Sequence, residues 1–150
     1  MTTTARVDLT GAVVTVLQAQ QTATPTLLRA VYVARPGSFP ELPAAYVGNA
    51  DERITYSSGT RTRTFTGLSA VIVDAFSDAM ESGTRMDVLV DLLVDRFTAA
   101  YATVAGGGSI LQLTGVRDTE VTVEAAGGVA AIYRGAILDF GETFISEGRT

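Results

Sequence analysis

The chain has 150 residues and a mass of 15.7 kDa, which is the length of one domain. Hydrophobic residues make up 47% of it and charged residues 18%, which is typical of a globular protein and excludes an intrinsically disordered one. The 16 acidic and 11 basic residues give a net charge of -5, which argues against a protein that wraps duplex nucleic acid, because such a protein needs surplus positive charge.

The first segment predicts an N-terminal tail over residues 1–7 and then a short helix. Asp8 is suited to cap this helix, and apolar residues recur near helical spacing from Leu9 to Leu17. The polar stretch Gln18–Thr26, which contains a proline, is expected to end the helix.

Strand and loop signals come next. Leu27–Val33 has the composition of a strand. Residues 34–45 hold three of the four prolines, which predicts a Pro-rich loop. Ala45–Gly48 is expected to form a short strand.

The middle of the chain predicts a hairpin. Arg53–Ser57 has strand composition, Ser58-Gly59 is a turn signal, and a long strand is expected over Arg61–Asp74. The apolar run Val71–Val73 near its end indicates burial on both faces of a sheet. Gly67 marks a candidate bulge or bend within this strand.

The strongest helical pattern runs from about Thr84 to Thr103. Thr84 and Asp87 resemble a weak capping box, and the glycines Gly106–Gly108 are expected to stop the helix. Apolar residues recur at i, i+3, i+4 and i+7, which predicts one buried face. These residues are Met86, Leu89, Val90, Leu93, Phe97 and Tyr101.

The last third of the chain predicts strands. They are expected over Ile110–Val116, Thr119–Ala125 and Val129–Phe144. Gly127-Gly128 is a hairpin turn signal, and Gly135 and Gly141 are candidate bend points in the final strand.

This order of elements predicts one α+β domain over residues 1–150, with an antiparallel or mixed β-sheet and two main helices packed on one face. The long strands present edges, and monomeric proteins protect such edges with Lys, Pro or short strands. Every basic residue here is Arg, and proline is nearly confined to one loop. We therefore expect identical neighbours to cover these edges in a closed, ring-forming assembly.

Two residue types that form many catalytic and metal sites are absent from the chain. The chain has no Cys and no His, which excludes disulfides, thiolate metal sites and the commonest general base. No stretch approaches the ~18–20 apolar residues that a membrane span needs, so no membrane partner is expected. The first residues, MTTTARVD, carry no secretory signal, and we expect an intracellular product.

An acidic stripe is predicted on the main helix. Asp87, Asp91 and Asp95 stand at i, i+4 and i+8, which places them on one side of a helix. They are candidates for binding Mg²⁺ or Ca²⁺, or for a solvated face that docks against a neighbour's Arg. We favour the second interpretation, because the spacing matches no calcium-binding loop.

Arginines cluster around the predicted middle hairpin. Arg61 and Arg63, with Arg53 across the turn, are candidates for a basic patch. Such a patch contacts phosphates, or its members pair with carboxylates on the same sheet face or across a subunit boundary. A different set, Asp118, Glu120 and Asp139, contains candidate paired catalytic carboxylates or ordinary hairpin surface residues.

The layout resembles the tail terminator proteins of long-tailed bacteriophages. The resemblance runs from about Asp8 to Gly148 and begins with the short amphipathic helix and the Pro-rich loop leading into AAYVGN. It continues through SSGTRTRTFTGLSAVIVDAF, MDVLVDLLVDRFTAAY, GVRDTEV and IYRGAILDFGETFISEG. None of these segments is a catalytic motif.

The resemblance implies a structural virion protein that forms a hexameric ring. The ring caps the head-proximal end of the tail tube and joins it to the neck, and DNA passes transiently through its lumen. Its implied partners are copies of itself, the tail tube protein and the connector or stopper protein of the neck. It implies no enzyme activity, no catalytic residue, no metal and no cofactor, and a location in the virion after assembly in the host cytoplasm.

On this interpretation six charged residues are candidates for intersubunit or lumen positions. They are Arg53, Arg61, Arg63, Asp87, Asp91 and Asp95. The acidic surplus suits a conduit whose wall must not retain DNA. Three alternatives stay open: another neck component, such as a head-tail stopper or adaptor, a small enzyme that uses carboxylates, and a regulatory binding module.

Overall fold

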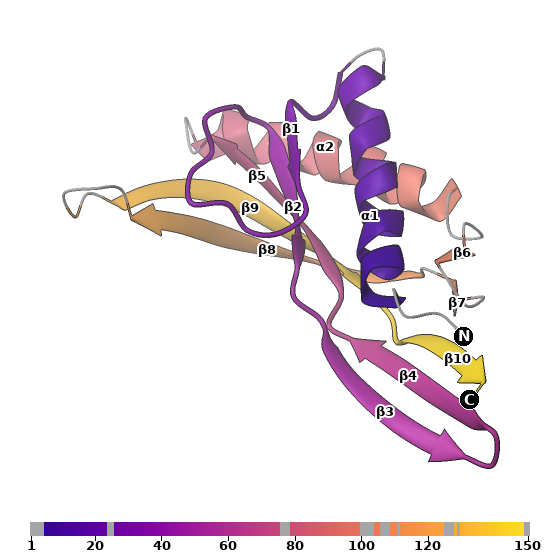
Figure 1. Ribbon diagram of the computed structural model, residues 1–150. Helices are drawn as coiled ribbons and strands as arrows, with labels where there is room; N and C mark the ends of the chain where they lie inside the picture. The colour runs from indigo at the N-terminus through magenta and orange to yellow at the C-terminus, as the bar shows by residue number, and fades with distance from the viewer. Residues whose placement is uncertain are drawn as a thin grey trace.

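The computed structural model describes residues 5–23, 26–75, 79–99, 104–105, 109–110, 112–124, 128 and 130–148. Its elements are α1 (Ala5–Thr22), β1 (Ala30–Tyr32), β2 (Ala44–Gly48), β3 (Asp51–Ser57), β4 (Thr60–Thr66), β5 (Ser69–Ala75), α2 (Ala79–Ala99), β6 (Val104–Ala105), β7 (Ser109–Ile110), β8 (Leu113–Glu124), β9 (Ala130–Phe140) and β10 (Thr143–Gly148). Figure 1 shows their arrangement.

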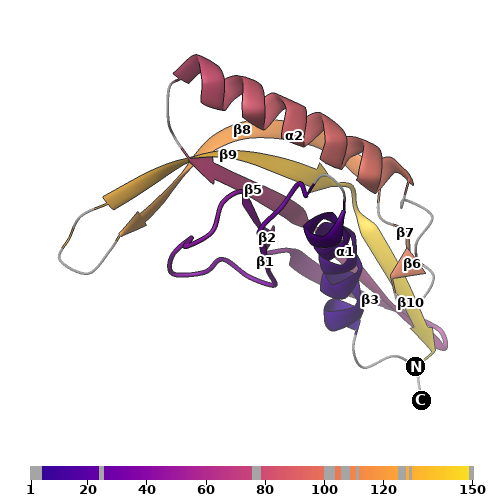
Figure 2. The same cartoon turned by 90° about the horizontal axis from the view of Figure 1, so that it is seen from above.

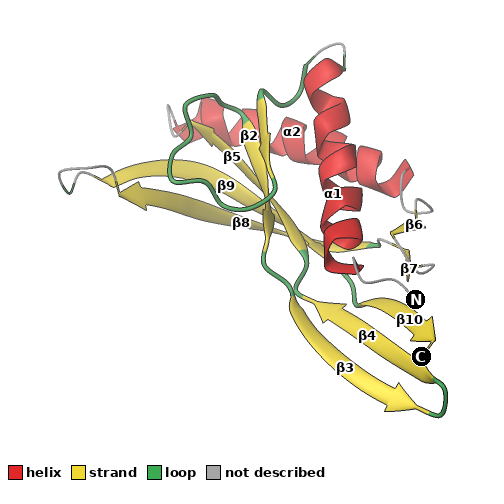
Figure 3. Cartoon of the chain, viewed as in Figure 1, coloured by secondary structure: helices red, strands yellow, loops and turns green. Residues whose placement is uncertain are grey.

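The main sheet has the strand order β1-β2-β5-β9-β8. β1 runs parallel to β2, and the other neighbours are antiparallel. The second sheet, which we call the arm sheet, has the order β10-β4-β3 and is antiparallel throughout. It extends away from the main sheet and the helices (Figure 3). The predicted α+β class with a mixed sheet is confirmed.

Both helices pack on one face of the main sheet, as predicted. Leu17 of α1 and Leu93 of α2 are fully buried in one cluster with Ile72 of β5 and Leu138 of β9. Figure 2 shows α2 lying along β9 and β8. The predicted apolar face of the main helix is buried at every member that the structure describes, while Tyr101 lies outside the described side chains.

The opposite face of the main sheet is covered by the Pro-rich loop, which crosses it between β1 and β2 (Figure 1). Phe39 of this loop is buried among three tyrosines, with ring centroids 6.3 Å from Tyr32, 6.0 Å from Tyr46 and 5.3 Å from Tyr133. The Arg35 guanidinium donates a hydrogen bond to the Thr122 carbonyl of β8. The loop therefore forms a second, smaller core and ties the two ends of the sheet together.

The aromatic cluster predicts a loss of stability in alkaline solution. Burial raises the pKa of the Tyr46 hydroxyl above its ordinary 10.0, and the nearby Arg35 charge opposes this only in part. The folded chain therefore holds this proton more tightly than the unfolded chain does. The contribution of the protonated Tyr46 hydroxyl to the free energy of unfolding is fully present below the unfolded pKa and is lost as pH rises through the higher folded pKa. We expect Tyr46→Phe to flatten the fall of unfolding free energy above about pH 10, measured by urea titrations. An unchanged slope would contradict this assignment.

Two predicted long strands are each divided between the two sheets. Arg61–Asp74 was expected as one strand, but β4 lies in the arm sheet and β5 in the main sheet. Gly67 stands between them with φ +78°, a left-handed conformation that favours glycine. The final predicted strand, Val129–Phe144, likewise divides into β9 and β10, and the Gly141 N–H donates to the Gln112 carbonyl at 2.8 Å where the chain leaves the main sheet.

Other boundaries differ from the predictions. α1 begins at Ala5 within the expected tail and continues to Thr22, because the glutamines between are good helix formers. α2 begins at Ala79, so Thr84 lies inside the helix and is not its cap. β8 joins two predicted strands into one, and the strand expected over Leu27–Val33 is limited to β1. Gly106–Gly108 and Gly127 lie outside the described residues.

Gly135 is not a bend point. It lies within β9, where a Cβ atom would come within 3.0 Å of the Thr119 methyl group, 3.1 Å of a Val121 methyl group and 3.3 Å of the Ile72 carbonyl. The missing side chain therefore allows close packing of β9 between its neighbours.

Candidate functional site

The register of the arm sheet separates the three candidate arginines. Antiparallel partners share a face, and Arg61 and Arg63 of β4 pair with Tyr56 and Ile54 of β3. Arg53 pairs with a threonine of β4 and therefore lies on the opposite face. The predicted patch of all three arginines is wrong: the two-residue turn places Arg53 out of phase with the other two.

Arg63 has its partner within the chain. Its Nε donates to the Glu52 carboxylate in an ion pair whose side chains are each 14% exposed. Its guanidinium also lies 5.6 Å from the centroid of the Phe65 ring. Pairing with a carboxylate on the same sheet face, one of the two structural alternatives, is thus confirmed for Arg63.

This pairing predicts that Arg63→Glu loosens the arm sheet. The change places two like charges together in a shielded position and should lower the free energy of unfolding by about 1–3 kcal/mol. Arg53→Glu is the matched control, since Arg53 is exposed and an ordinary surface change stays within about 0.5 kcal/mol. Urea unfolding measures both. Equal stabilities would mean that the Arg63–Glu52 pair does not support the arm.

The outer strand of the arm sheet exposes large apolar groups. Ile54 is 44% exposed and Tyr56 63% exposed, on the face they share with Arg61 and Arg63. Among the described strands, β3 pairs with β4 alone. This strand therefore presents an open edge together with apolar side chains, the combination that protein partners cover.

The acidic stripe lies on α2 as predicted. Asp87, Asp91 and Asp95 are all exposed, on the side of the helix away from the buried leucines. Within the described residues, no group of three or more His, Cys, Asp or Glu side chains is arranged to hold a metal ion. The stripe is a solvated helix face in the isolated chain.

The candidate catalytic carboxylates do not converge. Asp118 and Glu120 point to the helix side of the hairpin formed by β8 and β9, whereas Asp139 lies on the other side, because their register positions differ in parity. Asp139 accepts hydrogen bonds from Arg117 at 2.8 and 3.4 Å. This contact raises the pKa of the Arg117 guanidinium. The pair is an ion pair on the sheet surface.

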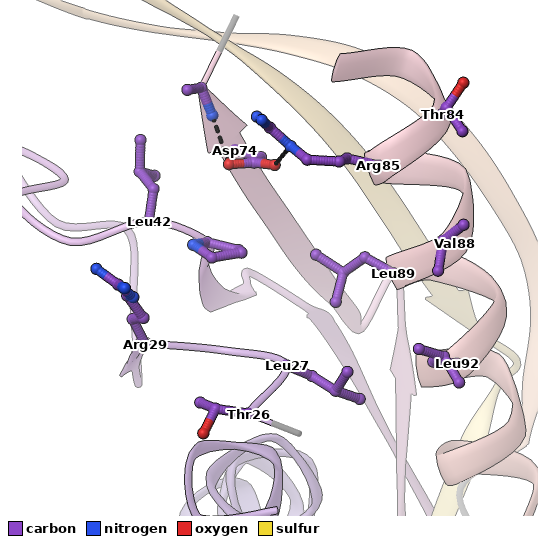
Figure 4. Close-up of a pocket in the computed structure, with 12 residues that line it drawn as sticks. Thr26, Leu27, Arg29, Leu42, Asp74, Thr84, Arg85, Val88, Leu89 and Leu92 are labelled. Atoms are coloured by element: carbon purple, nitrogen blue, oxygen red, sulfur yellow. Dashed lines mark hydrogen bonds and ion pairs between the residues drawn. The ribbon is translucent and has the colours of Figure 1, made fainter. Parts of the chain in front are cut away.

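An open groove between α2 and the main sheet was not predicted. Its volume is about 920 Å³, and Figure 4 shows the side chains around it. Its described lining consists of Thr26, Leu27, Arg29, Leu42, Pro43, Asp74, Ala75, Thr84, Arg85, Val88, Leu89 and Leu92. Most of these groups are apolar, so the groove suits an apolar occupant.

One buried carboxylate anchors the groove. Asp74, at the end of β5, accepts hydrogen bonds from Arg85 Nε at 3.2 Å and from the Ala75 N–H at 2.8 Å (Figure 4). A carboxylate directly after the buried run Val71–Val73 was the sequence signal for this contact. The groove itself brings together four segments distant in sequence, which no local pattern reveals.

No model of a protein family and no curated protein matches this chain. Within the described part of the chain, neither helix has the length and apolar character to cross a bilayer.

Proposed function

We propose that this chain is a structural virion protein, a tail terminator whose hexameric ring caps the head-proximal end of a phage tail tube and joins it to the neck. Its partners in this proposal are identical copies, the tail tube protein and the connector or stopper protein of the neck. DNA passes through the lumen without specific binding. The role needs no catalysis and no cofactor.

The observation that supports a ring most directly is the arm sheet. It projects from the body, and its outer strand β3 exposes Ile54 and Tyr56 beside an open edge (Figure 3). Only the base of this sheet is anchored in the core, through the fully buried Phe65 of β4, so its outer strand is the part that gains stability from packing against another surface. An exposed edge of this kind is also an aggregation risk unless a specific neighbour covers it.

Charge supports the same proposal. The net charge of -5 and the solvated stripe Asp87, Asp91 and Asp95 give the surface negative potential. Negative potential repels the DNA backbone, so a wall of this character lets DNA slide without retaining it. The exposed Arg53 is available to a carboxylate of a neighbouring copy.

The groove makes an enzyme the second candidate function. The residues that line the groove argue against it. Among the described lining residues Asp74 is the single carboxylate, and it is held by Arg85 and the Ala75 amide. A carboxylate pair, which glycoside hydrolysis requires, is therefore not assembled there.

Electron microscopy of the purified full-length chain tests the proposal. We expect six-fold annular particles with a central pore wide enough for duplex DNA. Ile54→Glu, which places a charge on the arm's apolar surface, should reduce the proportion of annuli. Val33→Glu is the matched control, because Val33 is 67% exposed and lies outside the arm. Particles of single-chain size throughout would overturn the ring.

A further inference from the structure

The groove beside α2 has an apolar wall, with one exposed arginine on the side opposite the helix. Val88, at 55% exposure, and Leu92 line it from the helix, and Leu27 and Leu42 line it from the opposite side (Figure 4). Arg85 is paired with Asp74, whereas the exposed Arg29 has no ion-pair partner among the residues that the structure describes. The groove therefore fits an occupant that combines an apolar side chain with a carboxylate.

The free end of the hairpin formed by β8 and β9 has this combination. β5 pairs with β9 only over Tyr133–Asp139, so residues 122–124 and 130–132, which we call the hairpin tip, pair only with one another. On the helix side of the hairpin, Ile132 is 53% exposed, and the exposed Glu124 lies two residues beyond its register partner Thr122. On the other side of Thr122, Glu120 is paired in register with Arg134.

The hairpin tip is held to the Pro-rich loop by the hydrogen bond from Arg35 to the Thr122 carbonyl, but its helix side stays exposed at Ile132. It projects beyond the main sheet as a two-stranded ribbon (Figures 1 and 2). Such a ribbon is marginal in water unless a third strand or another surface packs against it. The ribbon leads away from the body, so the groove of the same chain is not its natural partner.

We propose that the hairpin tip of one copy docks in the groove of a second copy, with Ile132 against Val88 and Leu92 and with Glu124 beside Arg29. Groove and tip are different surfaces, so the contact is head-to-tail, and a contact of this type closes into a ring when its rotation allows. This inference rests on the proposed function, because a ring needs a head-to-tail contact between neighbouring copies. The contact itself is compatible with assemblies of other sizes.

Disulfide trapping tests the contact directly, because the natural chain has no cysteine. In the double variant Val88→Cys with Ile132→Cys, docking brings the two thiols of neighbouring copies within bonding range. We expect mild oxidation to yield a ladder of covalent species on a non-reducing gel. The control is Val88→Cys with Val116→Cys, since Val116 is similarly exposed on the same hairpin but away from its tip. This control should stay uncross-linked.

The length of the ladder separates the two proposals. A ladder that ends at six chains supports both docking and the hexamer. A ladder that ends at two chains supports docking but overturns the ring, because two copies then exchange tips reciprocally. Six-fold annuli without cross-links would leave the ring standing and overturn the docking. A cross-link within a single chain would overturn the docking as well.

Charge exchange gives an independent measurement. Glu124→Arg should weaken self-association about tenfold, and Arg29→Glu should do the same. Combining both changes restores opposite charges and should recover most of the affinity. Glu142→Arg, on an exposed residue outside both surfaces, is the control. Equal losses that simply add in the combined variant would contradict a direct contact.

Discussion

Leu93→Asp is expected to unfold the chain. Leu93 is fully buried at the centre of the cluster that joins α1, α2 and the main sheet. The change removes a packed side chain, at a cost of about 2–5 kcal/mol, and buries a charge without a partner, at a cost of several more. Domains of this kind have only about 5–15 kcal/mol in total. Far-ultraviolet circular dichroism should therefore show loss of helix.

Val88→Asp is the matched control for this loss. Val88 lies on the same helix but is 55% exposed, so the new charge stays hydrated and the protomer should remain folded. A folded, soluble Leu93→Asp variant would mean that the buried face of α2 is assigned wrongly.

Phe39→Ala is expected to detach the Pro-rich loop from the main sheet. The substitution removes a buried aromatic ring that contacts three tyrosines. Burial of this size is worth about 3–5 kcal/mol, and the aromatic pairs add about 0.5–1.5 kcal/mol each. We expect a lower urea midpoint and faster proteolysis within residues 33–43.

Pro40→Ala separates the contribution of the Phe39 aromatic side chain from a general effect of changing the loop. Pro40 is exposed and adjacent to Phe39, so its substitution should shift the midpoint far less. Similar losses of stability in both variants would indicate that the loop is held on the main sheet by its backbone and not by the aromatic cluster.

Hydrophobic periodicity was sufficient to predict the class of the fold. The run Val71–Val73 predicted a strand buried on both faces, and β5 is buried on both faces between α2 and the Pro-rich loop. The spacing of Leu89, Val90 and Leu93 predicted the buried side of α2. Both patterns arise from contact with a large apolar surface, so they can be recognised without knowing which element forms that surface.

Sheet membership could not be predicted in the same way. Gly67 was recognised as a candidate bend, but a glycine permits a change of direction without specifying where the chain goes. The division of Arg61–Asp74 between the arm sheet and the main sheet depends on pairing with β10, which is about 80 residues away in sequence. Local composition carries no information about such a distant partner.

The candidate site was predicted in part. The exposed stripe on α2 follows from helical spacing alone. The separation of Arg53 from Arg61 and Arg63 was within reach of the sequence, because the turn Ser58-Gly59 fixes the register and with it the face of every residue in β3 and β4. The groove could not be predicted from the sequence, since its walls come from segments that only the folded chain brings together.

The mass of the particle in solution tests the central claim, that this chain completes its structure by associating with copies of itself. Sedimentation equilibrium over a wide concentration range measures it without immobilisation or labels. We expect a species of six times the 15.7 kDa chain that dissociates on dilution or on substitution at the hairpin tip. A single 15.7 kDa species at every concentration would contradict it.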